Sequence, residues 1–333
     1  MRLIGLIGGN NQLKAILEDQ SQLIFKEIYL NHAGKVRAMK LVNEVAGNLS
    51  LINLFIAIDN KLYHVNLDFK SIMTDNEVYL NDMNFSLVKE FKISPSPNAD
   101  EDFITFLESS RLNNLTRLFV GTTNDLFILD LEHDPENEDD FKIKNISHLL
   151  ENQVINYIYE EKSIVHERLW VGTENGLFIF DGKEKYNLLK HYHKKNSSLP
   201  SNSVIKILPL NHSKLLVTIK GIVLYPSWEV IENEYLFLDK ITGCVPIKKR
   251  NFLLSTIFGD VYLISFDETP ELQKLNGELT KSPIINIGKI KNYYFISNLK
   301  VNVFKIRCNN TTIEIKKICE IEDILPYCFC EIK

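Results

Sequence analysis

The sequence predicts an all-β fold, a seven-bladed β-propeller formed by the whole chain as one domain. A strand–turn–strand pattern recurs seven times, and further strand-like segments flank each copy. The chain starts without the first strand of a repeat and ends with a spare strand, ILPYCFCEI at 324–332. Repeated units of four short strands are typical of propeller blades.

The repeat is clearest in two copies that lie 51 positions apart. RLFVGTTNDLFILD at 117–130 and RLWVGTENGLFIFD at 168–181 share ten of fourteen residues. The same pattern, an apolar strand, a polar turn and a second apolar strand, predicts five more hairpins at 3–17, 54–68, 215–226, 252–267 and 293–307. Such spacing lies within the range known for propeller blades.

The turn and strand residues suit hairpins. Asp59-Asn60, Asn175-Gly176 and Gly259-Asp260 tolerate the positive φ angles that tight hairpin turns require. β-branched and aromatic residues flank these turns, as strands prefer. The Gly172-Thr173 pair, which ends one strand, predicts a crowded backbone at that point.

The strands around each hairpin complete seven predicted blades. If the C-terminal strand completes the N-terminal blade, the two chain ends close the ring and leave no open sheet edge at the seam. The approximate boundaries of the blades are 2–30 with 324–332, 36–92, 103–147, 154–193, 203–238, 241–278 and 283–321.

Two segments resemble the repeats of two-component-regulator propellers, which are WD40-like seven-bladed rings. In that family "L-P-S-N-x-V" leads into a strand and "L-W-x-G-T-x-x-G-L" forms a hairpin. SLPSNSVIKIL at 198–208 and RLWVGTENGLFIFD match these patterns, and the resemblance covers about residues 110–226. The Gly-His and Trp-Asp pairs of the WD40 signature are absent from the sequence. The resemblance implies a propeller fold and a role in sensing small ligands.

Composition narrows the class of protein. With 333 residues and 45% hydrophobic content, the chain can bury a large core. A net charge of −5 makes nucleic acid an unlikely partner and gives no drive toward anionic membranes. The sequence has no apolar run of about 18 residues and no secretory signal, so we expect a soluble cytoplasmic protein. Five scattered cysteines favour a reducing compartment and buried thiols over disulfides, metal or another cofactor.

Five segments are candidates for binding a partner. The basic turn Lys248, Lys249 and Arg250 could hold an acidic group, although a solvated turn is the simpler interpretation. His191 and His193 share one strand face, but a metal would need a third ligand. An acidic loop and the longer excursions of the second repeat at 75–85 and 94–102 could also bind a partner. The acidic loop carries Glu136, Glu138, Asp139 and Asp140.

The sequence contains no known catalytic or nucleotide-binding motif. GLIGGN at 5–10 has the wrong glycine spacing for a dinucleotide loop. The first hypothesis is therefore a non-enzymatic scaffold or complex subunit that binds other proteins. The alternatives are a small-ligand sensor and a lyase or hydrolase with its site at the mouth of the channel.

Overall fold

The computed structural model describes most of the chain. The described residues are 1–20, 22–42, 51–74, 78–80, 85–91, 102–112, 115–131, 142–150, 153–163, 166–182, 185–231, 240–266, 270–275, 282–298, 300–308, 313–322, 324 and 326–332. The chain divides into two compact units. Unit 1 comprises Met1–Val154 with Pro326–Lys333, and unit 2 comprises Ile155–Leu325.

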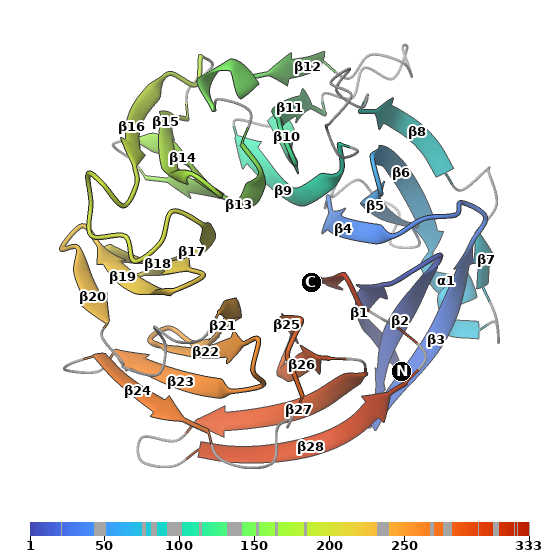
Figure 1. The fold of residues 1–333 in the computed structure, drawn as a ribbon. Helices are drawn as coiled ribbons and strands as arrows, with labels where there is room; N and C mark the ends of the chain where they lie inside the picture. Colours follow the sequence, from blue (N-terminus) through green and yellow to red (C-terminus); the bar gives the residue numbers. More distant parts are fainter. Residues whose placement is uncertain are drawn as a thin grey trace. The chain divides into compact units, whose positions relative to one another are not determined.

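Unit 1 contains three sheets, which we call blades one to three (Figure 1). Blade one has the order β29 (Cys328–Glu331), β1 (Arg2–Gly8), β2 (Gln12–Asp19), β3 (Gln22–Leu30) and β7 (Val78–Leu80). Blade two has the order β4 (Val36–Leu41), β5 (Leu51–Ile58), β6 (Lys61–Asp68) and β8 (Phe85–Glu90). Blade three contains β9 (Ile104–Leu112), β10 (Leu115–Thr122), β11 (Leu126–Asp130) and β12 (Lys142–Asn145).

Unit 2 contains four sheets of four strands each, blades four to seven. Blade four contains β13 (Ile155–Lys162), β14 (Glu167–Thr173), β15 (Gly176–Asp181) and β16 (Leu188–Tyr192). Blade five contains β17 (Val204–Leu210), β18 (Ser213–Thr218), β19 (Gly221–Tyr225) and β20 (Glu229–Ile231). Blade six contains β21 (Ile241–Lys248), β22 (Asn251–Thr256), β23 (Val261–Phe266) and β24 (Pro270–Lys274). Blade seven contains β25 (Asn286–Ile290), β26 (Tyr293–Ser297), β27 (Val301–Cys308) and β28 (Ile313–Ile321).

The short helices among the described residues are α1 (Phe69–Thr74) and the 3₁₀ turn η2 (Ser147–Leu149). In the described part of the chain, no helix has the length and hydropathy that crossing a membrane requires.

The predicted all-β, seven-bladed propeller is confirmed by these sheets, and so is the role of the C-terminal strand. β29 pairs antiparallel with β1, and Cys330 lies opposite Leu6. Backbone hydrogen bonds from Tyr327 to Gly8 (2.9 Å) and from Ile332 to Ile4 (3.0 Å) extend the pairing at both ends. The spare strand at one end of the sequence therefore completes the blade that lacks a strand at the other end.

The two similar sequence copies form hairpins in the same register. Arg117 pairs with Asp130 across β10 and β11, and Arg168 pairs with Asp181 across β14 and β15. In blade three this pair is also a salt bridge, with 3.2 Å between Nε of Arg117 and Oδ1 of Asp130. The Arg and Asp that bound the repeated phrase thus face each other across its hairpin.

The Gly-Thr pair of the repeat has two structural roles. A Cβ on Gly172 would lie 2.7 Å from the carbonyl oxygen of Val204 in blade five, so only glycine permits this approach of two blades. Thr173 is fully buried, and its hydroxyl donates to the carbonyl of Gly176 (3.1 Å) and accepts from the amide of Asn175 (3.0 Å). Thr218 makes the equivalent bond to Gly221 in blade five (2.9 Å).

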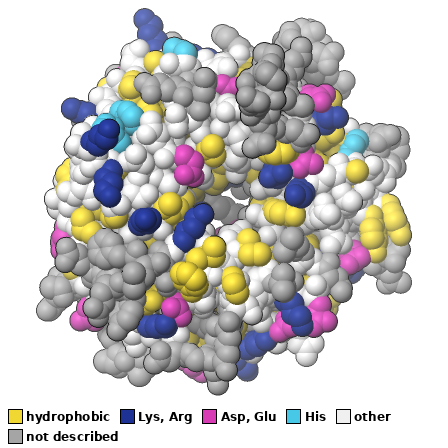
Figure 2. All heavy atoms as spheres, viewed as in Figure 1, with side chains coloured by type: hydrophobic (Ala, Val, Ile, Leu, Met, Phe, Trp, Pro, Cys, Tyr) yellow, Lys and Arg dark blue, Asp and Glu magenta, His cyan; other side chains and the backbone are white. Residues whose placement is uncertain are grey.

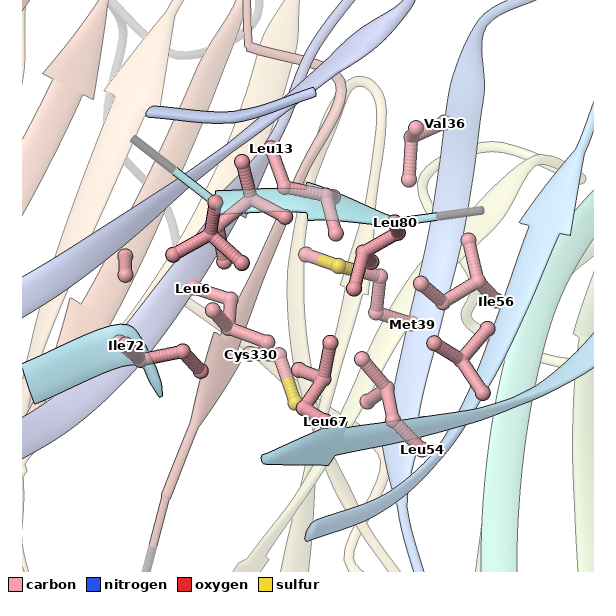
Figure 3. Packing of buried hydrophobic residues seen from close by; sticks show 14 of the residues in the cluster. Leu6, Leu13, Val36, Met39, Leu54, Ile56, Leu67, Ile72, Leu80 and Cys330 are labelled. Atoms are coloured by element: carbon pink, nitrogen blue, oxygen red, sulfur yellow. The ribbon is translucent and has the colours of Figure 1, made fainter. Parts of the chain in front are cut away.

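Buried side chains fill the space between neighbouring blades. In unit 1, a cluster between blades one and two includes Leu6, Met39, Ile56 and Cys330 (Figure 3). In unit 2, the first strands of neighbouring blades lie side by side, β13 with β17, β17 with β21, and β21 with β25. Within each unit, neighbouring sheets thus cover apolar faces of one another, because a single sheet cannot bury both of its faces alone.

Part of the excursion in the second repeat belongs to blade one, which the sequence did not predict. β7 follows α1 and pairs parallel with the outer strand β3, with Val78 opposite Ile28. Val78 and Leu80 are buried in the core cluster of Figure 3, whereas Tyr79 points outward and stacks on Tyr29 with ring centres 4.9 Å apart. A segment predicted to serve binding therefore has a structural role.

Candidate functional site

The basic turn lies at one end of blade six. Lys248 ends β21, and Lys249 and Arg250 form the turn that leads into β22. All three side chains are exposed, and the carbonyl of Arg250 accepts the amide of Phe266 (3.0 Å). The structure thus brings the three charges together on a solvated turn.

The two histidines lie close together and take part in turn structure. Their ring centres are 5.2 Å apart. His191 stacks on Phe178 at 3.9 Å, and its Nε2 lies 3.0 Å from the carbonyl oxygen of Asn175, to which it donates. Nδ1 of His193 accepts the amide of Lys195 (3.2 Å). Among the residues that the structure describes, no three His, Cys, Asp or Glu side chains are placed to hold a metal ion.

The remaining candidates lie outside the described residues. These are the acidic side chains Glu136, Glu138, Asp139 and Asp140, together with most of the excursion at 94–102.

A cluster of charged and aromatic side chains joins blades four and five. Glu161 accepts hydrogen bonds from Nζ of Lys214 (2.6 Å) and from the indole of Trp170 (3.0 Å). Lys214 also lies over the Trp170 ring at 4.5 Å, and Tyr225 meets that ring edge-on at 5.1 Å. The carboxylate, the ammonium group and the indole of this cluster are thus partners of one another.

Burial and these contacts shift the pKa values of Glu161 and of Tyr159, which lies on the same strand, β13. Burial alone would raise the pKa of Glu161, but the hydrogen bond and charge of Lys214 and the bond from Trp170 lower it overall. Burial raises the pKa of Tyr159, and the charge of Glu161 adds to that shift. The cluster therefore holds a carboxylate ionised between two blades, which suits a structural link better than proton transfer near neutral pH.

A different region of unit 2 exposes apolar side chains. The turn between β22 and β23 carries Ile257 and Phe258, whose exposed fractions are 39% and 66%. Ile285, just before β25, is 53% exposed. Figure 2 shows hydrophobic side chains gathered over β21, β22, β25 and β26, with Lys and Arg side chains beside them.

Backbone contacts connect this region into one row across blades five, six and seven. The amide of Ile241 donates to Ile219 (2.9 Å), so Lys240 lies next to the turn that carries Lys220. The amide of Ile257 donates to Lys240 (2.8 Å). A Cβ on Gly259 would lie 2.6 Å from the carbonyl oxygen of Ser282, which leads into Ile285. We call the side chains of Lys220, Lys240, Ile257, Phe258 and Ile285 the Phe258 surface.

The Phe258 surface and the basic turn lie at opposite ends of blade six. β22 starts next to Arg250 and ends next to Ile257, and its six residues span about 20 Å. The sequence candidates at His191 and His193 lie at the same end as the Phe258 surface. The segment that follows them places Pro200 3.0 Å from a Cβ built on Gly221, beside Lys220.

The turn residues of blade six differ from those of other blades, and this difference in the sequence could have indicated the surface. The equivalent turns of blades two to four carry Asp59-Asn60, Asn124-Asp125 and Glu174-Asn175, which are polar. Blade six carries Ile257-Phe258 before its glycine. Large apolar side chains at a turn tip gain nothing from folding when they stay exposed, and such patches often mark interaction sites.

No model of a known protein family matches the chain, and no curated protein matches its sequence.

Proposed function

We propose that this protein is a non-enzymatic protein-interaction propeller, a scaffold or a subunit of a larger complex. One observation carries the proposal, the exposed apolar turn at Ile257-Phe258 beside the exposed Ile285. Aromatic side chains that are exposed in the free protein and rigidly placed by a sheet are the usual anchors of protein interfaces. The turn is held by the backbone contacts of Gly259 and Ile257, so the anchor is positioned before a partner arrives.

We further propose that the repeats are of the two-component-regulator type and that the protein works in a reducing, intracellular compartment. Two residues of the segment 198–208, which resembles that repeat, have structural roles in this protein. Leu199 is buried, and Asn202 accepts the amide of Lys194 (2.8 Å). The thiols of Cys244, Cys319, Cys328 and Cys330 are free, which supports the choice of compartment.

The test is affinity capture of the tagged protein from its native cells, followed by quantitative mass spectrometry. The wild type is compared with Phe258→Ser and with Leu189→Ser as a matched control. Leu189 is 46% exposed on the outer strand of blade four, so the control removes a similar exposed apolar side chain elsewhere in unit 2. Circular dichroism first establishes that both variants fold.

We expect at least one protein at stoichiometric yield with the wild type and with Leu189→Ser, reduced about tenfold or more by Phe258→Ser. The proposal fails if the wild type brings down no stoichiometric partner, or if Phe258→Ser retains every partner at the wild-type yield.

A further inference from the structure

We infer that the Phe258 surface binds an extended segment of a partner protein that has acidic residues toward one end and large apolar residues toward the other. This inference rests on the proposed function and adds the chemistry of the partner. The geometry points to it through the row of side chains, their charge and the order in which they lie.

The row is polarised. Its blade-five end carries the exposed lysines Lys220 and Lys240, and its blade-six and blade-seven end carries Phe258 and Ile285. The backbone bonds from Ile241 to Ile219 and from Ile257 to Lys240 set this order. A peptide bound along the row would therefore contact the lysines at one end and Phe258 and Ile285 at the other.

Among the residues that the structure describes, the two lysines lack an acidic partner. Within the described ranges of the chain, no carboxylate forms an ion pair with Lys220 or Lys240. The connection from blade four to blade five adds Lys194 and Lys195, both exposed. In a chain of net charge −5, four exposed lysines at one end of neighbouring blades create a local positive field that attracts carboxylates and repels other basic segments.

Three described carboxylates on the same side of unit 2 are paired with other lysines. Asp260, directly after the Phe258 turn, lies 2.7 Å from Nζ of Lys274. Glu320 and Glu322 both pair with Lys300 in blade seven. These pairs reduce the negative charge on this side of unit 2.

An extended segment fits this arrangement better than a compact ligand. The side chains come from separate turns of three blades and form a row along the sheet ends. An extended chain advances about 3.3 Å per residue, so a short peptide can cross two blades. Its carboxylates would pair with the lysines while its apolar side chains cover Phe258 and Ile285.

The experiment is selection of short random peptides displayed on phage against the whole protein. Phe258→Ser serves as the counter-selection target. Selected peptides are then measured by fluorescence anisotropy against the wild type, Phe258→Ser, the double variant Lys220→Glu/Lys240→Glu and the control Lys190→Glu. Lys190 is exposed on the outer strand β16, away from the row, so the control reverses a charge without touching the surface.

We expect peptides with acidic residues at one end and Phe, Leu or Trp at the other. Phe258→Ser and the double charge reversal should each weaken their binding about tenfold or more, and Lys190→Glu should leave it within about twofold. Raising the salt concentration from about 0.05 to about 0.5 M should weaken wild-type binding severalfold and leave the charge-reversed protein little affected.

Three results would overturn the inference. If the selected peptides require Phe258 but show no excess of acidic residues, the proposed pairing of acidic residues with Lys220 and Lys240 is wrong. The scaffold function is not contradicted by that result. If no selected peptide depends on Phe258, the inference falls, while native capture still decides the scaffold function separately. If a labelled oligouridine binds the wild type and loses binding in Phe258→Ser, the surface recognises single-stranded nucleic acid by base stacking instead.

Discussion

Nζ of Lys214 lies 2.6 Å from Oε1 of Glu161, and this ion pair joins the second strand of blade five to the first strand of blade four. Trp170 donates to the other carboxylate oxygen of Glu161 at 3.0 Å. The side chains of both charged residues are largely buried. Two blades are therefore linked by a polar contact inside an aromatic cluster as well as by apolar packing.

Lys214→Met should destabilise unit 2 by about 1–3 kcal/mol, because it leaves a mostly buried carboxylate with the indole of Trp170 and the more distant, exposed His166 as partners. The measurement is urea unfolding followed by tryptophan fluorescence. Lys317→Met is the matched control, since Lys317 is exposed and its partner Glu320 keeps Lys300. The control should leave the unfolding midpoint unchanged, and equal midpoints for both variants would contradict the assigned role of the pair.

The contribution of Glu161 should depend on pH. The folded protein lowers the pKa of Glu161 below its ordinary value of 4.5, because the bonds and charge of its partners outweigh burial. The stability lost in Glu161→Gln should therefore be constant above pH 4.5 and shrink as the pH falls through the lower folded-state pKa. Urea unfolding of both proteins over a pH series tests this.

The control for the pH experiment is the same comparison in a Lys214→Met background. Without the ammonium group, burial is the largest remaining influence and acts to raise the pKa of Glu161, so the shrinkage of the difference toward low pH should disappear or reverse. If the difference in stability between the wild type and Glu161→Gln stays constant across the pH series, the ion pair with Lys214 does not stabilise the charged form of Glu161.

Gly172→Ala should destabilise unit 2 by about 1–3 kcal/mol, because the added methyl group would lie 2.7 Å from the Val204 carbonyl oxygen. The neighbouring atom is backbone, so the two blades must move apart to relieve the contact. Thermal and urea unfolding measure the effect. Ser198→Ala, at an exposed position of the connection between the same two blades, should change the stability little. Equal stability of the two variants would contradict the close approach of Gly172 to Val204.

Removal of residues 326–333 should destabilise blade one, because β1 loses the antiparallel partner that carries Cys330. The amides of β1 should then exchange hydrogen faster. A synthetic peptide of residues 326–333 added in trans should restore their protection, whereas a scrambled peptide should not. Full protection of β1 in the truncated protein would mean that the terminal strand contributes no stability to the blade.

Cys244 and Cys330 should react slowly with a thiol reagent near neutral pH. Burial raises the pKa of the Cys244 thiol to about 12 and that of Cys330 to about 11, so the reactive thiolate is scarce. Labelling followed by peptide mass spectrometry gives the rate at each site. Ser198→Cys supplies an exposed reference thiol, and equal rates at that thiol and at Cys244 would disprove the burial.

Much of the fold was predictable because the repeat consists of local sequence patterns. The Arg and Asp that end each copy of the phrase face each other, as in Arg117 and Asp130. Asp59 at φ 50° and Gly176 at φ 123° adopt the positive angles that their turns require. These features depend on neighbours within one hairpin, so a stretch of about a dozen residues is sufficient to specify them.

The candidate site was less predictable because it depends on which turns lie together. Ile257-Phe258 and Ile285 are separated in the sequence by a full pair of strands. Lys220 joins them only through the hydrogen bonds of Ile219 and Ile241. The sequence marked the basic turn at Lys248 because its charges are consecutive, whereas the charges of the Phe258 surface come from different blades.

The sequence by itself determined the strands, the turns, the number of blades and the pairing of the two chain ends, because period-two patterns and turn residues act locally and repeat. Only the tertiary structure decided that β7 joins blade one, that Lys214 pairs with Glu161, and that the turn of Phe258 lies beside Lys240. These contacts arise between residues far apart in the chain. Their energies depend on burial and distance, which exist only after the blades have packed.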